Sequence, residues 1–303
     1  MKDVATSVSL VLLYLGIASV YIALAFAATA SGVATPWLIV GALAACLALP
    51  FAVTTMSFTL AWIFRTPRPP AYRIGLASSV RMFIDEAMAI ARSHPRMAFG
   101  WWLMRDPPPE RAAAPVLLLH GVLCNAGIWH GTIPRLVAAG CGPVYTLSYA
   151  PPTASIERFA EQLDAKIEAI CNATGAARVA IVTHSMGGLV ARAYMRRFGG
   201  VRVRCLVTVG APHHGSIDAW MFPGECLAQM RPGNAWLAAL NGYANPSATR
   251  IVSLWSRHDS MVAPQASAEL AGADNIAFTG IGHNALVEHP DVVARIIAEL
   301  SRA

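Results

Sequence analysis

A long stretch near the start of the chain carries no charged residue. From Val4 to Phe64 the sequence has no Asp, Glu, Lys or Arg, and it is apolar apart from a short turn-forming segment in its middle. A helix needs about 20 apolar residues to cross a bilayer core, so this stretch is long enough for two spans. The predicted spans are Val8 to Ala28 and Trp37 to Phe64. We expect residues 1–64 to form a transmembrane helical hairpin.

Two other interpretations of the apolar stretch stay open at this point. One is a cleaved signal peptide followed by a single anchor, because small residues near Ala28 resemble a cleavage site. Only Lys2, offset by Asp3, precedes the apolar core, and a signal peptide leaves the second apolar run unexplained. The other is a buried or re-entrant arrangement of the two runs.

Arginines mark one end of the predicted hairpin. Arg65, Arg68 and Arg73 follow the second run, whereas the turn between the runs has no charge. Positively charged flanks of membrane spans stay on the cytoplasmic side. We therefore expect a bacterial-type inner membrane with both chain ends, and the catalytic part, on the cytoplasmic side.

The remaining charge and the cysteines suggest no nucleic-acid partner and no metal. The net charge is +6, but the basic residues are scattered, without the dense run or interleaved aromatic residues of a nucleic-acid groove. The six cysteines form no CxxC pair and no Cys/His ligand spacing. We expect neither a zinc site nor a disulfide framework.

Residues 65–112 are predicted to connect the hairpin to a globular domain. A proline-rich segment is followed by an amphipathic helix that either packs on the domain or lies on the bilayer surface. Its apolar face is predicted to comprise Leu76, Val80, Phe83, Ile84, Ala87, Met88 and Ala91, opposite Arg81, Asp85, Glu86 and Arg92. Residues 98–104 are predicted to form an edge strand.

Strand-like and helix-like segments alternate through residues 113–303. Strands are predicted at 116–121, 143–149, 177–185, 203–210, 250–256 and 275–280, with helical segments between most of them and a helix at the end. Such alternation predicts an α/β fold, with a mostly parallel sheet covered by helices on both faces.

The stretch VAIVTHSMGGLVARAYM, Val179 to Met195, places a serine where a strand meets a helix. A strained turn of this kind projects the hydroxyl of Ser185 above the sheet and needs small residues beside it. Gly187 and Gly188 meet that need, whereas Thr183 stands where a glycine is usual. On this stretch alone, an ordinary strand-to-helix turn remains an equal alternative.

The partners that a nucleophilic serine requires follow in a recognisable order. A serine needs a histidine base, and the histidine needs a carboxylate to hold its tautomer. Asp259 and His283 each follow a predicted strand downstream of Ser185, where the carboxyl ends of strands carry ligands. The alternatives are a helix cap for Asp259 and a solvent-facing loop for His283. His258 and His289 compete for the role of base.

An oxyanion site is predicted at the end of the first strand of the domain. The loop LLLHGVLCN places His120 and Gly121 before Val122. The amide N–H groups of Val122 and Met186 are the predicted oxyanion donors. A plain β-turn at Gly121 is the alternative.

Residues 211–247 lie between predicted strands and are rich in large apolar side chains. This stretch is predicted to form a lid or an acyl-chain pocket, because long loops in compact domains are usually functional. The alternative is a small satellite core beneath a long loop.

The segments HGVLCN, THSMGGLVARAY, APHHG, SRHDSMV and GIGHNAL together resemble the α/β-hydrolase superfamily, in particular the bacterial triacylglycerol lipase and esterase group. The resemblance covers about residues 113 to 302. It implies ester hydrolysis through an acyl-enzyme, no cofactor, and a triad of Ser185, Asp259 and His283. The predicted substrate contacts are His120, Gly121, His184, His213 and Trp220.

We therefore expect a membrane-anchored serine hydrolase that cleaves lipid or other carboxylic esters. Two alternatives stay open: an acyltransferase or thioesterase on the same scaffold, and a non-catalytic membrane interaction module with the same fold.

Overall fold

The computed structural model describes residues 5–243 and 249–302. The helices are α1 (Ala5–Ala30), α2 (Thr35–Ile63), α3 (Leu76–Ala98), α4 (Gly100–Leu103), α5 (Ile133–Ala138), α6 (Ile156–Thr174), α7 (Gly187–Phe198), α8 (Glu225–Gln229), α9 (Ala235–Asn241) and α10 (Pro290–Arg302). The strands are β1 (Val116–Leu119), β2 (Val144–Leu147), β3 (Val179–His184), β4 (Val203–Val209), β5 (Arg250–Ser256) and β6 (Asp274–Phe278). Short 3-10 helices are η1 (Pro70–Tyr72), η2 (Ala126–Trp129), η3 (Ile217–Trp220), η4 (Gln265–Ala268) and η5 (Ala285–Val287).

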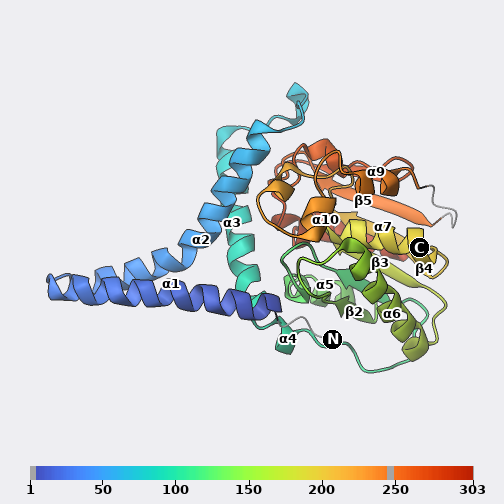
Figure 1. The fold of residues 1–303 in the computed structure, drawn as a ribbon, viewed down its shortest axis with the longest axis horizontal. Helices are drawn as coiled ribbons and strands as arrows, with labels where there is room; N and C mark the ends of the chain where they lie inside the picture. The colour runs from blue at the N-terminus through green and yellow to red at the C-terminus, as the bar shows by residue number, and fades with distance from the viewer. Residues whose placement is uncertain (1–4, 244–248, 303) are drawn as a thin grey trace.

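The N-terminal hairpin consists of two helices that project away from the rest of the molecule. α1 and α2 meet at a tip remote from the sheet, and their other ends lie beside α3 and the globular domain (Figure 1). Both are long and apolar enough to cross a membrane. Large apolar side chains are exposed along them, among them Leu12, Phe26 and Trp37. The expected pair of long apolar helices is thus confirmed.

The globular domain is built on one parallel sheet. Its six strands lie in the order β2-β1-β3-β4-β5-β6, and every neighbouring pair is parallel. Parallel neighbours need crossover connections, which the intervening helices supply. The predicted α/β architecture is confirmed.

Both faces of the sheet are buried, so its central strands are apolar at consecutive positions. In β1, Leu117 and Leu119 join the apolar core beneath α6 and α7. Val116 and Leu118 point the other way, into the core beneath α5 and α10. Polar residues at the carboxyl ends of strands include Thr183 and His184 of β3 and Ser256 of β5.

α6 shows how local signals set the limits of a covering helix. The side chain of Ser155 accepts a hydrogen bond from the backbone N–H of Arg158 and caps the start. Gly175 ends the helix with φ 74°, a left-handed conformation that suits glycine.

The connector helix α3 buries only part of the predicted apolar face, including Ala87. Leu76, Val80 and Ile84 are exposed, although they belong to the predicted apolar face. Glu86, predicted on the polar face, is fully buried, together with Met82 and Ile90 one turn away on either side. The predicted edge strand at 98–104 is also wrong, because α4 forms there.

Candidate active site

Ser185 lies on a strained turn between β3 and α7. Its φ is 55°, in the left-handed region that side chains other than glycine rarely adopt. The backbone N–H of Ser185 donates to the carbonyl oxygen of Val209 over 2.8 Å, which ties the turn to the end of β4. The side chain therefore stands at the carboxyl edge of the sheet, where a nucleophile elbow places it.

The glycines after the serine permit the turn to pack. A Cβ atom on Gly187 would lie 2.8 Å from the backbone oxygen of His120. A Cβ atom on Gly188 would lie 2.6 Å from the Cβ of Ala211. Both distances are too short for a side chain, so α7 approaches β1 and β4 this closely only with glycine at both positions. Thr183, at the usual glycine position, is fully buried without preventing the turn.

The predicted acid and base are directly hydrogen-bonded. Nδ1 of His283 donates to Oδ2 of Asp259 over 2.9 Å, and both side chains are buried. Oδ1 of Asp259 accepts the backbone N–H groups of Met261 and Val262, each over 2.8 Å. The carboxylate is thus fixed, and it fixes the tautomer that leaves Nε2 of His283 free to accept a proton.

Charges around His283 raise its pKa. Burial lowers the pKa, but the charge and hydrogen bond of Asp259, with the charges of Glu86 and Asp218, raise it above the ordinary histidine value. The neighbouring His184 has a pKa well below the ordinary value, because of burial and the closeness of His283. Its neutral Nε2–H donates to the backbone oxygen of His283 over 3.2 Å. His184 therefore supports the loop that carries His283, and His283 remains the predicted base.

The predicted oxyanion loop lies against the nucleophile. A Cβ atom on Gly121 would be 2.9 Å from the Cβ of Ser185, so only glycine allows this approach. Among the described residues, no turn or loop hydrogen bond uses the backbone N–H of Val122 or Met186. Both amides belong to segments that flank Ser185, as donors to a tetrahedral oxyanion must.

Ser185 and His283 line a cavity of about 290 Å³. Its walls come from the domain and also from α1, α2 and α3. The hairpin and connector supply Leu10, Val53, Met56, Ser57, Ile90, Ser93, His94 and Met97. The stretch predicted as a lid or acyl pocket supplies Pro212, Ser216, Asp218, Ala219, Met221, Phe222, Leu227 and Met230. The last residues of that stretch, 244–247, lie outside the described residues.

The predicted substrate contacts divide into two groups. Gly121 and His184 line the cavity beside Ser185. His120 stacks on Tyr149 behind the oxyanion loop, and its pKa is lowered to about 4, chiefly by burial. His213 is buried against Arg192 and Trp220 is exposed, and neither lines the cavity. The positions of His120, His213 and Trp220 thus do not support direct contact with a substrate.

Glu86 is a site residue that the sequence analysis missed. Its Oε1 accepts from the hydroxyl of Ser260 over 2.8 Å, from the backbone N–H of Asn284 over 3.0 Å and from the Asn284 side chain over 2.9 Å. Its Oε2 accepts the N–H of Ala285 over 2.9 Å. The Ser260 hydroxyl in turn accepts the N–H of His283 over 3.2 Å. One carboxylate from α3 therefore holds together the loops that carry the acid and the base.

A sequence signal for Glu86 did exist. Met82, Glu86 and Ile90 follow one another at intervals of four, so they share a stripe of the helix. A charged residue between apolar neighbours on such a stripe is either exposed or held by several donors. The apolar residues on the other side of α3 predicted a different buried face, so this stripe was not identified from the sequence.

Asp218 is the carboxyl residue that lines the cavity at Ser185. Burial, and to a lesser degree the charge of Asp259, raise its pKa to about 7, although His283 acts in the opposite direction. Oδ1 of Asp218 is buried and has no hydrogen-bond partner in the described part of the chain. A pKa near neutrality makes the charge of Asp218, which acts on His283, sensitive to pH in this range.

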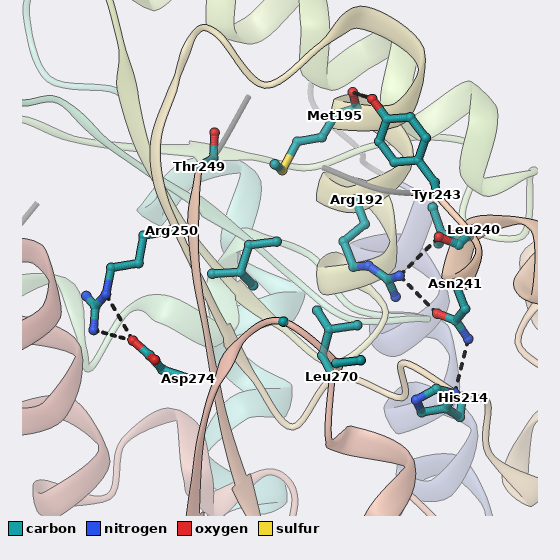
Figure 2. A pocket seen from close by; sticks show the side chains of 13 residues that line it. Arg192, Met195, His214, Leu240, Asn241, Tyr243, Thr249, Arg250, Leu270 and Asp274 are labelled. Carbon is teal, nitrogen blue, oxygen red and sulfur yellow. Dashed lines mark hydrogen bonds and ion pairs between the residues drawn. The ribbon is translucent and has the colours of Figure 1, made fainter. Parts of the chain in front are cut away.

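A different cavity, of about 680 Å³, lies between α7, α9 and the β5–β6 edge. Figure 2 shows the guanidinium of Arg192 pointing to Asn241 and the backbone of Leu240, while Arg250 pairs with Asp274. None of the three predicted catalytic residues lines it. Ser185 and His283 line the other cavity instead.

Comparisons with known proteins agree with this fold. The family model for the alpha/beta hydrolase fold matches residues 114–239. A triacylglycerol lipase of Vibrio cholerae is 32% identical over 115 residues, covering 36% of each protein. One from Burkholderia plantarii is 32% identical over 109 residues, covering 34% of this chain and 30% of the relative. The chain thus spans about a third of the length of the curated relatives it matches.

Two solved structures show the same fold. A Bacillus licheniformis lipase in mature form superposes with a TM-score of 0.57 at 17% identity, covering 64% of this chain and 96% of that one. Aspergillus fumigatus lipase B superposes with a TM-score of 0.59 at 19% identity, covering 78% of this chain and 63% of that one. The globular domain therefore has the α/β-hydrolase fold, and about a third of the chain is similar in sequence to bacterial triacylglycerol lipases.

Proposed function

We propose that this protein is a membrane-anchored serine hydrolase that cleaves carboxylic esters of lipids, with Ser185 as the nucleophile. The observation that carries the proposal is the 2.9 Å hydrogen bond between His283 and Asp259, beside a serine on a strained turn that opens into the same cavity. The strained turn at Ser185 costs conformational energy, and the buried hydrogen bond between His283 and Asp259 requires a specific geometry. Together they match the requirements of nucleophilic catalysis by serine.

The reaction follows from this arrangement. Nε2 of His283 takes the hydroxyl proton as Oγ of Ser185 attacks the ester carbonyl carbon, and the N–H groups of Val122 and Met186 bind the oxyanion. Collapse of the tetrahedral intermediate breaks the ester bond, and the departing alkoxide takes the proton from His283. A water, deprotonated by His283, then attacks the acyl-enzyme. The carboxylic acid leaves and the Ser185 hydroxyl is restored.

The cavity walls support a lipid as the substrate. Apolar side chains dominate the contribution from the hairpin and connector, including Leu10, Val53 and Met56. An acyl chain bound there would lie against helices that are themselves apolar enough for a bilayer. The relatives named as triacylglycerol lipases support the same class of substrate.

The exposed apolar surface of α1 and α2 supports membrane anchoring, since water does not cover such a surface favourably. Contacts at the start of α1 favour its retention over cleavage as a signal peptide. The hydroxyl of Ser7 donates to the backbone oxygen of Met97 over 2.8 Å and accepts from Asn125 over 3.1 Å. The arginines after α2 favour the cytoplasmic side for the domain. A C-terminal fusion should then be active with a cytoplasmic reporter and silent with a periplasmic one, and the reverse result would contradict this orientation.

The test of the activity compares esters of increasing acyl length with the wild type and Ser185→Ala, both purified free of host esterases. The variant should lose hydrolysis of every ester while keeping membrane insertion and thermal unfolding nearly unchanged. Hydrolysis at the wild-type rate by the variant would refute the proposed role of Ser185.

A further inference from the structure

A cavity of about 900 Å³ lies where α2 ends and the connector begins. It is bounded by the last turns of α2, the segment between α2 and α3, the first half of α3, and the loop after β5. Three arginines that follow α2, Arg65, Arg68 and Arg73, line it together with His258. Ser185 and His283 do not line it, so it is separate from the catalytic cavity.

The charge in this cavity is positive and uncompensated. Within residues 5–243 and 249–302, none of the three arginines takes part in an ion pair. The single carboxylate in the lining is Asp259, whose oxygens are occupied by His283 and two backbone N–H groups. Arg68 also has a lowered pKa because of burial and the nearby Arg65. An anion in the cavity would relieve this repulsion.

Two buried donors in the lining lack partners. His258 is 2% exposed, and its Nδ1 accepts the backbone N–H of Gly280 over 3.2 Å. With Nδ1 occupied as an acceptor, the neutral ring carries its proton on Nε2, which has no partner among the described residues. Nε of Arg68 is likewise buried and unpartnered. Buried donors are normally satisfied, so a missing acceptor is indicated here.

The cavity lies at the depth where lipid headgroups would lie. α2 is apolar until Ile63, and the arginines begin two residues later. Trp62 is exposed, and the guanidinium of Arg65 lies 4.8 Å from the centre of its ring. An aromatic residue next to cations at the end of an apolar helix is typical of a membrane–water interface.

We propose that this cavity binds the anionic phosphate headgroup of a membrane phospholipid, with Arg65, Arg68, Arg73 and the Nε2–H of His258 as its donors. The proposal rests on the proposed membrane anchoring of the hairpin. Anionic lipids of the cytoplasmic leaflet attract basic residues next to membrane spans, and here the basic residues line one open cavity. Because His258 precedes Asp259, a lipid seated there lies directly behind the loop of the catalytic acid.

The experiment measures lipid binding without hydrolysis. Full-length Ser185→Ala protein in neutral detergent is titrated calorimetrically with short-chain phosphatidylglycerol, with phosphatidylcholine of the same chain length, and with inorganic phosphate. Phosphatidylglycerol should bind saturably and at least about tenfold more tightly than phosphatidylcholine. Changing Arg65, Arg68 and Arg73 together to Gln should weaken phosphatidylglycerol binding about 10²-fold and leave phosphatidylcholine unaffected.

A matched control removes the same net charge elsewhere. Arg81, Arg92 and Arg178 are exposed and lie outside the cavity, so their combined change to Gln should preserve phosphatidylglycerol binding. Equal affinity for the two lipids, an equal loss in the control, or displacement by equimolar inorganic phosphate would each overturn the proposal. These binding results do not depend on Ser185 chemistry, whereas failure of ester hydrolysis by the wild type would count against the proposed function alone.

Discussion

The globular domain and the N-terminal helices contribute to the candidate site in different ways. The domain supplies the proposed catalytic residues, Ser185, Asp259 and His283, at the carboxyl edge of its sheet. The helices α1 to α3 supply none of these groups, but they line the same cavity and place Glu86 beneath two catalytic loops. Sequence motifs identify the proposed catalytic residues. The position of those residues also depends on α1 to α3, which contain no hydrolase motif.

The largest effect is expected on the domain side, at Asp259. Asp259→Asn should favour the wrong tautomer of His283 and lower kcat by about 10⁴-fold, with the fold intact. Steady-state ester hydrolysis, with circular dichroism as a control for folding, checks this. Near-normal turnover would move the role of the acid to another carboxylate, with Asp218, which lines the cavity at Ser185, tested next.

The next largest effect is expected from Glu86 on α3, whose substitution should affect the catalytic loops of the domain. Glu86→Gln should lower kcat by about 10²-fold, because the loops of Asp259 and His283 lose a shared set of hydrogen bonds. Asp85→Asn is the matched control, since Asp85 is the neighbouring carboxylate on α3 and is exposed.

The pH dependence separates positioning by Glu86 from simple structural support. His283 must be neutral to act as a base, so the acid limb of kcat/KM reports its pKa. Burial lowers this pKa, whereas Asp259, Glu86 and Asp218 raise it. Removal of the Glu86 charge should lower the pKa of His283 and extend activity to lower pH. If neither kcat nor the acid limb changes in Glu86→Gln, α3 does not position the catalytic groups.

The smallest effect tests whether the hairpin forms a wall of the substrate cavity. Met56→Trp fills space beside Ser185 from α2 and should lower kcat/KM for long-chain esters about tenfold, with little change for short-chain esters. Leu43→Trp, on an exposed part of α2 outside the cavity, should leave both unchanged. A uniform loss for all chain lengths would show that α2 does not contact the acyl chain.

The sequence predicted the domain well because independent signals agreed there. In β1, β3 and β4, apolar runs of strand length are closely followed by glycines, so period, length and turn chemistry all indicate the same topology. Asp259 and His283 were predictable because parallel strands place their carboxyl ends at one edge. The 2.9 Å hydrogen bond between them lies within the geometry that this expectation requires.

The connector was predicted less well because its helix has apolar residues on more than one side. Leu76 and Val80 suggested one buried face, but α3 packs between the hairpin and the domain and buries Glu86 instead. Whether a carboxylate is exposed or held by four donors depends on distant loops, here those at Ser260 and Asn284. Helical periodicity alone does not contain that information.

The most direct test of the account is covalent labelling of Ser185 in the full-length wild-type protein. A fluorophosphonate probe should add one adduct by intact-mass measurement, and peptide mapping should locate it on Ser185. Labelling should be absent in Ser185→Ala and much slower in His283→Ala, because the serine needs its base. An adduct on another residue, or no adduct on the folded wild-type protein, would contradict the claim that the elbow serine is the nucleophile.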